Sequence, residues 1–310
     1  MFRGECPPLA KKVTLSPRVM RVATWNVNSL KARLEKLLWW LERAAPDILL
    51  MQETKLADGD APRDELARRG YELAHHGEGG ANGVAIASRL PLTEVITNFG
   101  LPLVPPATPD PDDEPLREAR MVAAVAGGIR FVSIYAPNGR TLGSIFYEAK
   151  LTWFRQLQRW LTETRSPREA LVIGGDYNVA PTDADVWDPA RCHGGTHVSP
   201  PERQAFDALR AWGLADGYRR LHPEPERYTW WDYRAGMFHK NFGMRIDHLL
   251  VTAPIAERIV WAEIDREARK GKPIPSDHAP LLLDLDSPGR PLDAGWDAAT
   301  ARIAQRRRMR

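Results

Sequence analysis

A short apolar segment, residues 171–173, runs into two glycines and then presents a carboxylate and an amide, Asp176 and Asn178. Such a β-branched, apolar run predicts a buried strand. Residues two apart in an extended chain point to the same face, so we expect both polar side chains to look out from the strand end. We also expect the glycines to let the backbone turn sharply and approach a ligand. A strand followed by an ordinary Asx turn gives the same pattern. The ends of the other strands must therefore decide between a functional site and a simple turn.

The composition limits the classes of protein that the chain can represent. Its 310 residues suffice for one large α/β domain or two ordinary ones. The net charge is only +3, so any basic surface must be local. The two cysteines, Cys6 and Cys192, argue against a disulfide framework and fit a reducing, cytoplasmic location. We find no secretory signal in residues 1–18 and no stretch apolar enough to span a membrane, so we predict no membrane partner.

Hydrophobic periodicity predicts alternating strands and helices. Strands are expected at 19–25, 48–51, 71–74, 83–88, 119–125, 129–135, 171–176, 228–231, 244–251, 258–264 and 281–285. Helices are expected at 30–43, 63–69, 146–164 and 202–212. The proline-rich, acidic stretch 101–117 predicts a surface loop. No linker divides the chain, so we predict a flexible leader at 1–18, one catalytic domain at 19–287 and a basic C-terminal tail at 288–310.

Polar side chains recur where the predicted strands end. They are Asn26, Glu53, Tyr135, Asp176 with Asn178, Asp277 with His278, and Asp247 inside a sixth strand. Strand ends lie along one rim of a sheet, so these groups could converge. Packed carboxylates repel one another unless a cation neutralises them. Oxygen ligands without cysteine suit Mg²⁺ or Mn²⁺, and such an ion with phosphate oxygens is typical of phosphate-ester chemistry.

Nine short motifs carry a resemblance to a known family and cover residues 20–285. They are Thr-Trp-Asn-Val-Asn-Ser-Leu from Thr24, Gln-Glu-Thr-Lys from Gln52, Glu-Ala-Arg from Glu118, Tyr-Ala-Pro-Asn-Gly from Tyr135, Gly-Gly-Asp-Tyr-Asn from Gly174, Pro-Thr-Asp from Pro181, Trp-Trp-Asp-Tyr-Arg from Trp230, Arg-Ile-Asp-His-Leu-Leu from Arg245 and Ser-Asp-His-Ala-Pro from Ser276. Each motif alone is weak, but all nine occur in the family's order. The chain resembles the exonuclease III type of apurinic/apyrimidinic (AP) endonuclease, within the endonuclease/exonuclease/phosphatase superfamily.

The resemblance implies a fold and an activity. The fold would be a four-layer α/β sandwich, with two packed mixed β-sheets flanked by helices. The activity would be that of a monomeric, Mg²⁺-dependent DNA repair nuclease, with Mn²⁺ as a possible substitute. It would cleave double-stranded DNA on the 5′ side of abasic sites, leave a 3′-hydroxyl, and trim or clean 3′ ends as an exonuclease. The alternatives are another phosphoesterase of the superfamily, acting on lipid or RNA, and a DNA-binding homologue without catalysis.

The resemblance also implies roles for individual residues. The implied metal set is Asn26, Glu53, Asp176, Asn178, Asp277 and His278. The implied catalytic set is Tyr135, Asp176, Asn178, Asp247 and His278. Asp176 would orient or deprotonate the attacking water, Tyr135 and His278 would contact the phosphate, and Asp247 would fix His278.

Residues for DNA and lesion contact follow from the same resemblance. They are Arg120, Trp230, Arg234, Lys240, Met244 and Arg245. Trp230 and Met244 would form a small apolar pocket for a flipped sugar without a base. The basic residues would contact neighbouring phosphates, and Arg120 would lie near the active site. By contrast, His193 and His197 have no further ligands nearby in sequence, so we expect both to lie on the surface.

Overall fold

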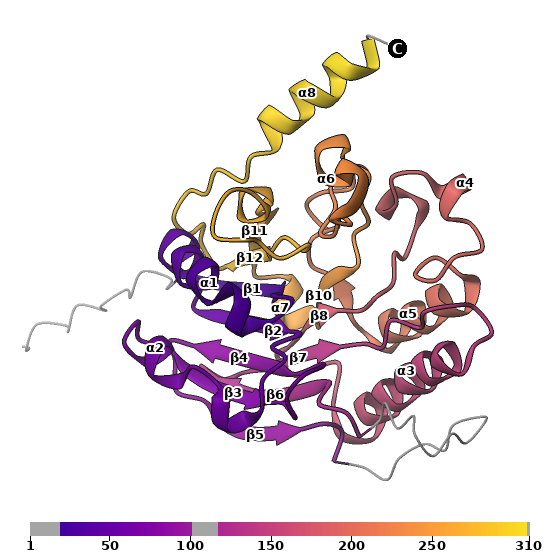
Figure 1. The fold of residues 1–310 in the computed structure, drawn as a ribbon. Helices are drawn as coiled ribbons and strands as arrows, with labels where there is room; N and C mark the ends of the chain where they lie inside the picture. Colours follow the sequence, from indigo (N-terminus) through magenta and orange to yellow (C-terminus); the bar gives the residue numbers. More distant parts are fainter. Residues whose placement is uncertain (1–18, 101–116, 309–310) are drawn as a thin grey trace, which may run out of the picture.

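The computed structural model describes residues 19–100 and 117–308. Across these residues, twelve strands form two six-stranded sheets packed face to face, with helices on the outer faces (Figure 1). The predicted four-layer α/β sandwich with two mixed sheets is confirmed. The predicted leader and the expected loop at 101–117, apart from its last residue, lie outside the described residues.

The first sheet has the strand order β11-β12-β1-β2-β4-β3. Its strands are β1 (Met20–Asn26), β2 (Ile48–Gln52), β3 (Glu72–His76), β4 (Val84–Ser88), β11 (Ile259–Ile264) and β12 (Leu281–Leu285). Strands β1 and β2 are parallel, and the other neighbouring pairs are antiparallel. The carboxyl ends of β1 and β2 therefore lie together at one edge of this sheet.

The second sheet repeats this arrangement with the order β5-β6-β7-β8-β10-β9. Its strands are β5 (Thr93–Thr97), β6 (Met121–Ala126), β7 (Ile129–Tyr135), β8 (Leu171–Asp176), β9 (Ala215–Asp216) and β10 (Asp247–Val251). Here β7 and β8 are the parallel pair. Each sheet thus offers one pair of neighbouring carboxyl ends.

The longer helices begin at serine caps and cover the outer faces. Helices α1 (Leu30–Ala44) and α2 (Arg63–Ala67) lie on the first sheet, and α3 (Ile145–Thr164) and α5 (Pro200–Trp212) on the second. Ser29 and Ser144 accept backbone N–H groups of α1 and α3, and Ser199 forms a capping box with Glu202 of α5. The helices predicted at 30–43, 146–164 and 202–212 are confirmed. The remaining α-helices of the described residues are α4 (Pro189–Cys192), α6 (Met237–Lys240), α7 (Ala253–Ala256) and α8 (Trp296–Arg308).

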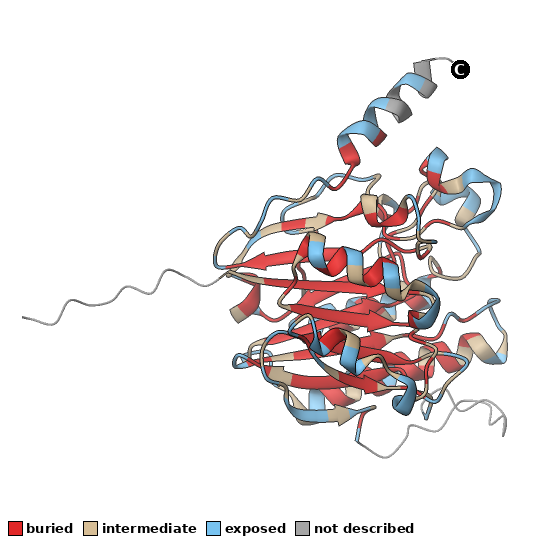
Figure 2. Ribbon diagram, turned by 60° about the vertical axis from the view of Figure 1, so that its left-hand side comes forward, coloured by how far each residue is buried: buried red, intermediate tan, exposed pale blue. Residues whose placement is uncertain are grey.

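Three apolar layers hold the sandwich together. One lies between the sheets and includes Ile48, Phe131 and Leu249. The other two lie between each sheet and its helices, around Trp40 on α1 and Trp153 on α3. Figure 2 shows the central strands buried along most of their length, whereas the helices expose one face. Burying both faces of a sheet in this way explains why most core strands read as apolar runs and not as alternating ones.

The two glycines before Asp176 do not form a turn, which corrects the expectation from sequence. They lie inside β8, and the register pairs Gly175 with Ile134 of β7. A Cβ on Gly175 would stand 1.9 Å from the Ile134 carbonyl oxygen, and one on Gly174 would stand 2.5 Å from Leu50 Cδ1. The glycines are needed for close packing within and between the sheets.

Two further segments differ from expectation. Residues 228–231 are not a strand, because Trp230 makes only isolated bridges to Met244 and His278. The predicted polar tail contains buried residues: Trp296 Nε1 donates to the Ile264 carbonyl at 2.7 Å, and Ala299 joins the core between the sheets. Figure 1 shows the rest of α8 projecting from the body. Among helices in the described part of the chain, none has both the length and the apolar character needed to cross a membrane.

We predict that Gly175→Ala lowers the free energy of unfolding by about 1–3 kcal/mol, because the added methyl group overpacks the sheet. The matched control is Gly59→Ala, where an added Cβ meets nothing within 4 Å. That change should stay within about 0.5 kcal/mol. Urea unfolding of both variants measures the difference, and equal stability of the two would contradict the packing role.

Candidate active site

The parallel strand pairs of both sheets end at one shared place. Asn26 is the last residue of β1, Glu53 directly follows β2, and Tyr135 and Asp176 end β7 and β8 as register partners. The Asn26 side-chain amide joins the two sheets, because Nδ2 donates to Glu53 Oε1 at 2.8 Å and to Asp176 Oδ2 at 2.9 Å. The convergence predicted from the strand ends is therefore present in the structure.

Two returning segments complete this group. Asp247 begins β10 directly opposite Asp176 in the antiparallel register, and His278 lies three residues before β12. The His278 segment is fixed to β1, since its carbonyl accepts from Trp25 Nε1 at 3.1 Å and Ser276 Oγ donates to the Asn26 carbonyl at 2.7 Å. Antiparallel strands that start where the parallel strands end bring these side chains to the same edge.

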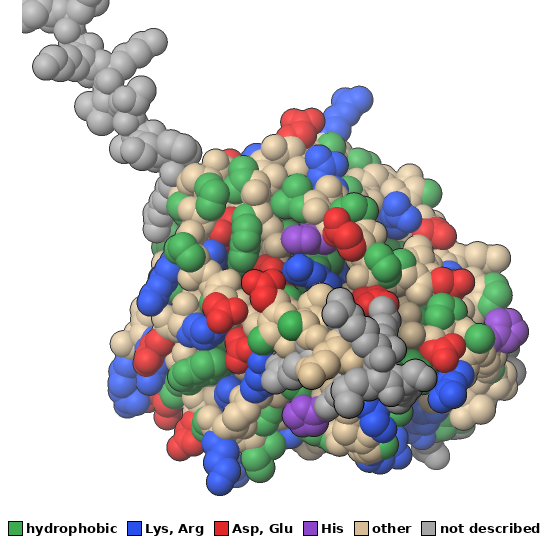
Figure 3. All heavy atoms as spheres, turned by 90° about the horizontal axis from the view of Figure 1, so that it is seen from above, with side chains coloured by type: hydrophobic (Ala, Val, Ile, Leu, Met, Phe, Trp, Pro, Cys, Tyr) green, Lys and Arg blue, Asp and Glu red, His purple; other side chains and the backbone are tan. Residues whose placement is uncertain are grey.

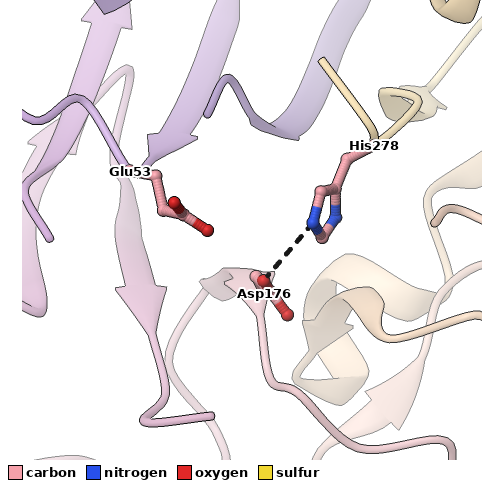
Figure 4. A group of neighbouring side chains, drawn as sticks. All are labelled: Glu53, Asp176 and His278. Atoms are coloured by element: carbon pink, nitrogen blue, oxygen red, sulfur yellow. Dashed lines mark ion pairs between the residues drawn. The ribbon is translucent and has the colours of Figure 1, made fainter. Parts of the chain in front are cut away.

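Glu53, Asp176 and His278 form a group that could hold a metal ion. Each offers one ligand atom, and the three atoms lie within 4.8 Å of one another. Figure 4 shows the three side chains pointing toward a common space from three separate segments. The two carboxylates offer hard oxygen donors, and the group contains no sulfur, which fits a small divalent cation.

Asp247 orients the His278 ring and stabilises its protonated form. The His278 Nδ1–H donates to Asp247 Oδ2 at 2.8 Å. Burial lowers the pKa of His278, but the neighbouring carboxylates, Asp247 first, raise it to about 10. The imidazole is therefore cationic near neutral pH before any metal binds. A metal ligand nitrogen must be unprotonated, so the charged ring is better suited to a phosphate oxygen.

Asp176 has the properties of a general base. Its Oδ1 accepts from the Asn178 backbone N–H at 2.9 Å, and His278 Nε2 lies 3.8 Å from Oδ2. Burial, followed by the charge of Asp247, raises the pKa of Asp176 to about 7. A carboxylate with a pKa near neutrality can both accept and release a proton at that pH.

Tyr135 lies beside the carboxylates with its hydroxyl protonated. Burial, and then the charges of Glu53 and Asp176, raise the pKa of Tyr135 well above its usual value. The Arg120 guanidinium lies 4.9 Å from the Tyr135 ring centroid and donates to the Tyr135 carbonyl at 3.2 Å. Arg120 also pairs with Glu118 and is buried, so it supports Tyr135 and does not face an open surface.

Asn178 is held in a left-handed backbone conformation, with φ at 51°. Its side-chain Nδ2 donates to the Ala136 carbonyl at 3.0 Å, and its Oδ1 accepts from Asn138 Nδ2 at 3.2 Å. Asn138 lies in the Tyr-Ala-Pro-Asn-Gly motif, to which the sequence analysis gave no role beyond its tyrosine. The two asparagine amides thus lie side by side behind Asp176.

Asp277 stands apart from the three-residue group. Its Oδ1 accepts from Asn28 Nδ2 at 2.9 Å and its Oδ2 from Trp230 Nε1 at 3.0 Å. Burial raises the pKa of Asp277, but the charge of His278 and these two hydrogen bonds hold it below its usual value. Its side-chain oxygens thus contact Asn28 and Trp230.

Sequence reasoning missed Lys55 and Asn28. The Lys55 ammonium lies 2.8 Å from both Glu53 Oε2 and Asn28 Oδ1. Burial raises the pKa of Glu53, but hydrogen bonds from Asn26 and Lys55 bring it below its usual value. A signal was available, because each missed residue lies in the same sequence motif as an assigned one, two positions further along the chain.

Trp230 and Met244 lie together, as predicted. Their backbones exchange hydrogen bonds of 2.9 and 3.0 Å, and both side chains are half-buried. They pack against a small apolar cluster of Ala180, Val186 and Ile246, with Val198 and Cys192 at its border. The hydrogen bond from Trp230 to Asp277 places this apolar surface next to the polar group.

Arg245 is not a DNA contact, which corrects the sequence assignment. Its side chain is 1% exposed and pairs with Asp185 at 2.7 Å and Asp216 at 2.8 Å, while its Nη1 lies 2.9 Å from His248 Nδ1. It joins β10 to β9 and to the loop after Asn178 from the inside. Arg245 lies in the predicted strand 244–251, and the sequence gave no signal for which face of that strand its side chain occupies.

The other basic candidates are exposed. The Arg234 side chain is 87% exposed and pairs with Asp232, and Lys240 is exposed on α6. On the face seen in Figure 3, acidic and basic side chains are interspersed, in keeping with the small net charge. DNA contact by Arg234 and Lys240 stays a prediction.

Comparisons with known proteins agree with this geometry. The profile of the Endonuclease/Exonuclease/phosphatase family matches residues 23–278. The chain is 31% identical to exodeoxyribonuclease III of Haemophilus influenzae, over 86% of this chain and all of that relative. Among solved structures it is similar to an AP endonuclease from Archaeoglobus fulgidus (36% identity, TM-score 0.79) and to the 3′ phosphatase NExo from Neisseria bound to a product DNA hairpin (39% identity, TM-score 0.79). Both matches cover 86% of this chain and all of the solved chain.

The fold and the polar group define a phosphoesterase of the sandwich type, and the profile match shows that the chain belongs to the Endonuclease/Exonuclease/phosphatase family. Within that family it is a nuclease of the exonuclease III type, as the relatives named exodeoxyribonuclease III and AP endonuclease indicate. The resemblance inferred from the nine motifs is confirmed.

We predict that Asp247→Asn lowers the pKa of His278 by about one unit or more, from about 10 toward the ordinary value of 6.5. The amide oxygen still accepts from Nδ1–H, so the variant removes charge and keeps the hydrogen bond. NMR titration of the His278 ring in metal-free protein measures the shift. Asp265→Asn, a buried carboxylate bonded to Trp40, is the control and should leave His278 unchanged.

Proposed function

We propose that this protein is a Mg²⁺-dependent DNA repair nuclease that hydrolyses the phosphodiester on the 5′ side of abasic sites. Double-stranded DNA is the substrate, the product end is a 3′-hydroxyl, and the same site trims and cleans 3′ ends. The observation that carries the proposal is the meeting of Glu53, Asp176 and His278 within 4.8 Å at the junction of the sheets. A monomeric state and a cytoplasmic location stay predictions.

The residues present fit a divalent metal site. Glu53 and Asp176 would hold the ion, with the Asn26 and Asn178 side chains beside them and Asp277 in support through Asn28. Mg²⁺, or Mn²⁺ in its place, supplies positive charge to the phosphate when bound. His278 supplies a second positive charge from the protein itself, and Tyr135 supplies a neutral donor. These groups neutralise the charge that develops on the phosphate oxygens during attack.

Asp176 is the group that moves the proton. Its carboxylate accepts a proton from a water molecule as the water oxygen attacks phosphorus in line with the leaving oxygen. The P–O bond to the leaving oxygen breaks, and the released 3′ oxygen gains a proton to become the 3′-hydroxyl. Asn178, beside Asp176, orients the water or a phosphate oxygen through its side-chain amide.

Selection of an abasic site would come from the apolar surface of Trp230 and Met244. A sugar without a base fits a small apolar pocket beside the reacting phosphate, whereas a nucleotide with a base is excluded. The hydrogen bond between Trp230 Nε1 and Asp277 fixes the pocket wall to the catalytic group.

A second candidate keeps the chemistry and changes the main substrate. The similarity to a Neisseria 3′ phosphatase, at 39% identity over all of that chain, favours removal of phosphate from blocked 3′ ends as the principal activity. A lipid or RNA substrate lacks a comparable observation. The intact polar group from Asn26 to His278 argues against a homologue without catalysis.

The proposal is tested with a panel of duplexes carrying an internal abasic site, a 3′-phosphate or neither. We expect Mg²⁺-dependent incision of the abasic duplex, abolished by EDTA and restored by added Mg²⁺. Asp176→Asn should lower kcat about a thousandfold while DNA binding is retained, because it removes the proton acceptor and keeps the shape. Near-normal turnover by this variant would exclude the assigned base, and turnover of the 3′-phosphate duplex alone would favour the second candidate.

Trp230→Ala should reduce the preference for abasic over intact DNA by roughly ten- to a hundredfold, with a smaller effect on phosphodiester cleavage itself. The ratio of kcat/KM for the two duplexes measures this preference. Trp39→Ala, an exposed tryptophan on α1, is the control and should leave the ratio unchanged. An unchanged ratio in Trp230→Ala would remove the pocket assignment.

A further inference from the structure

Two side chains from outside the described site converge on one backbone atom of Asn178. Its carbonyl oxygen accepts from Lys150 Nζ at 2.7 Å and from His197 Nδ1 at 2.6 Å. A carbonyl can only accept, so Nδ1 of His197 carries its proton here. His197 therefore turns toward the active-site loop, which corrects the expectation that it is a free surface residue.

Lys150 is a buried cation on α3. It is 0% exposed, donates also to the Asn138 carbonyl at 3.3 Å, and pairs with the fully buried Glu202 of α5. Removing an ammonium and a carboxylate from water is expensive, so such a pair is weak evidence for stability. Its contacts connect the backbone carbonyls of Asn138 and Asn178 to the outer helices α3 and α5.

His197 is itself held in an uncommon conformation. Its φ is 76°, in the left-handed region that favours glycine. Its N–H donates to Glu202 Oε1 at 3.0 Å, and its carbonyl accepts from the Ala180 N–H at 2.8 Å. These two hydrogen bonds fix the backbone of His197 in this conformation, and its ring contacts Asn178. Residues held in uncommon backbone conformations concentrate at functional sites.

The carbonyl oxygen that these donors hold belongs to a residue whose own backbone and side chain have several further partners. Asn178 has a φ of 51°, its N–H donates to Asp176 Oδ1 at 2.9 Å, and its side chain bonds Ala136 and Asn138. Rotation of the peptide group after Asn178 would displace its amide relative to Asp176. Displacements of about 1 Å at a reacting centre can lower rates about a hundredfold.

We propose that Lys150 and His197 are positioning residues that clamp the Asn178 carbonyl and so fix the Asn178 and Asn138 amides against Asp176. Neither residue touches the reacting atoms; both act through Asn178. The inference rests on the proposed function of Asn178 in phosphodiester hydrolysis. It adds a buried set of donors, contributed by α3 and the loop before α5, to the active site.

His197 allows the proposal to be separated from a merely structural role. His197→Gly removes the donor and relieves the strain at φ 76°, so the fold should be as stable as wild type or more so. His197→Asn places an amide N–H near the position of Nδ1 and tolerates the left-handed region. We expect kcat to fall about tenfold or more in the glycine variant, with KM within about threefold, and to recover in the asparagine variant.

The control is His193→Asn in the same loop, where the exposed ring should be dispensable for turnover. All variants are compared on whichever duplex, abasic or 3′-phosphate, wild type turns over fastest. An unchanged kcat in His197→Gly overturns the proposal. A loss of kcat that Asn does not restore, accompanied by a lower melting temperature, also overturns it, because it indicates a structural role.

A second measurement addresses Lys150. If both donors act through one carbonyl, Lys150→Met with His197→Gly should lower kcat by less than the product of the two single effects. If the two single effects on kcat multiply in the double variant, the shared clamp is overturned. Should Lys150→Met fail to fold, the comparison of His197→Gly with His197→Asn decides alone. If the wild-type protein acts on no DNA duplex, the proposed function is excluded. That outcome differs from all the results described for the His197 and Lys150 variants.

Discussion

The structure depends on how it stabilises several ionisable side chains that are buried close together. Asp176, Asp247 and His278 are buried where the two sheets meet, and Glu53 lies beside them. Unscreened carboxylates at such distances repel one another, so the arrangement needs positive charge and donors. His278 supplies charge, and the Asn26 amide bridges the two sheets. Both lower the pKa of Asp176, but burial and the charge of Asp247 outweigh them and raise it. The same features make the group suitable for a cation and a phosphate.

Around this centre lie further buried charged residues that form ion pairs with one another. Arg245 pairs with Asp185 and Asp216, and Lys150 pairs with Glu202. Each pair fixes one side of the segment that follows β8, where Asn178 lies. A buried ion pair adds little net stability, but it holds one geometry against alternatives, and here that geometry belongs to the segment that carries Asn178. Breaking one partner would leave an uncompensated charge inside the protein.

How far sequence reasoning reached can be seen from particular elements. The helices α1, α3 and α5 were predicted nearly to their ends because hydrophobic periodicity is a local signal. The group Asn26, Glu53, Asp176 and His278 was predicted because motifs recur at strand ends. The strand at 228–231 was wrong, since its aromatic residues satisfy β-propensity while no strand pairs with them over its length. His197 was missed because its partner is a backbone atom.

The sequence by itself determined the periodic elements, the buried character of the strands and the identity of the family, because these follow from local patterns and ordered motifs. Only the tertiary structure decided which charged residues face inward. Arg234 and Arg245 look alike in sequence, yet Arg234 is exposed and Arg245 is enclosed between two carboxylates. The physical reason is that exposure depends on partners brought from distant segments, and no local pattern records the direction in which a side chain meets them.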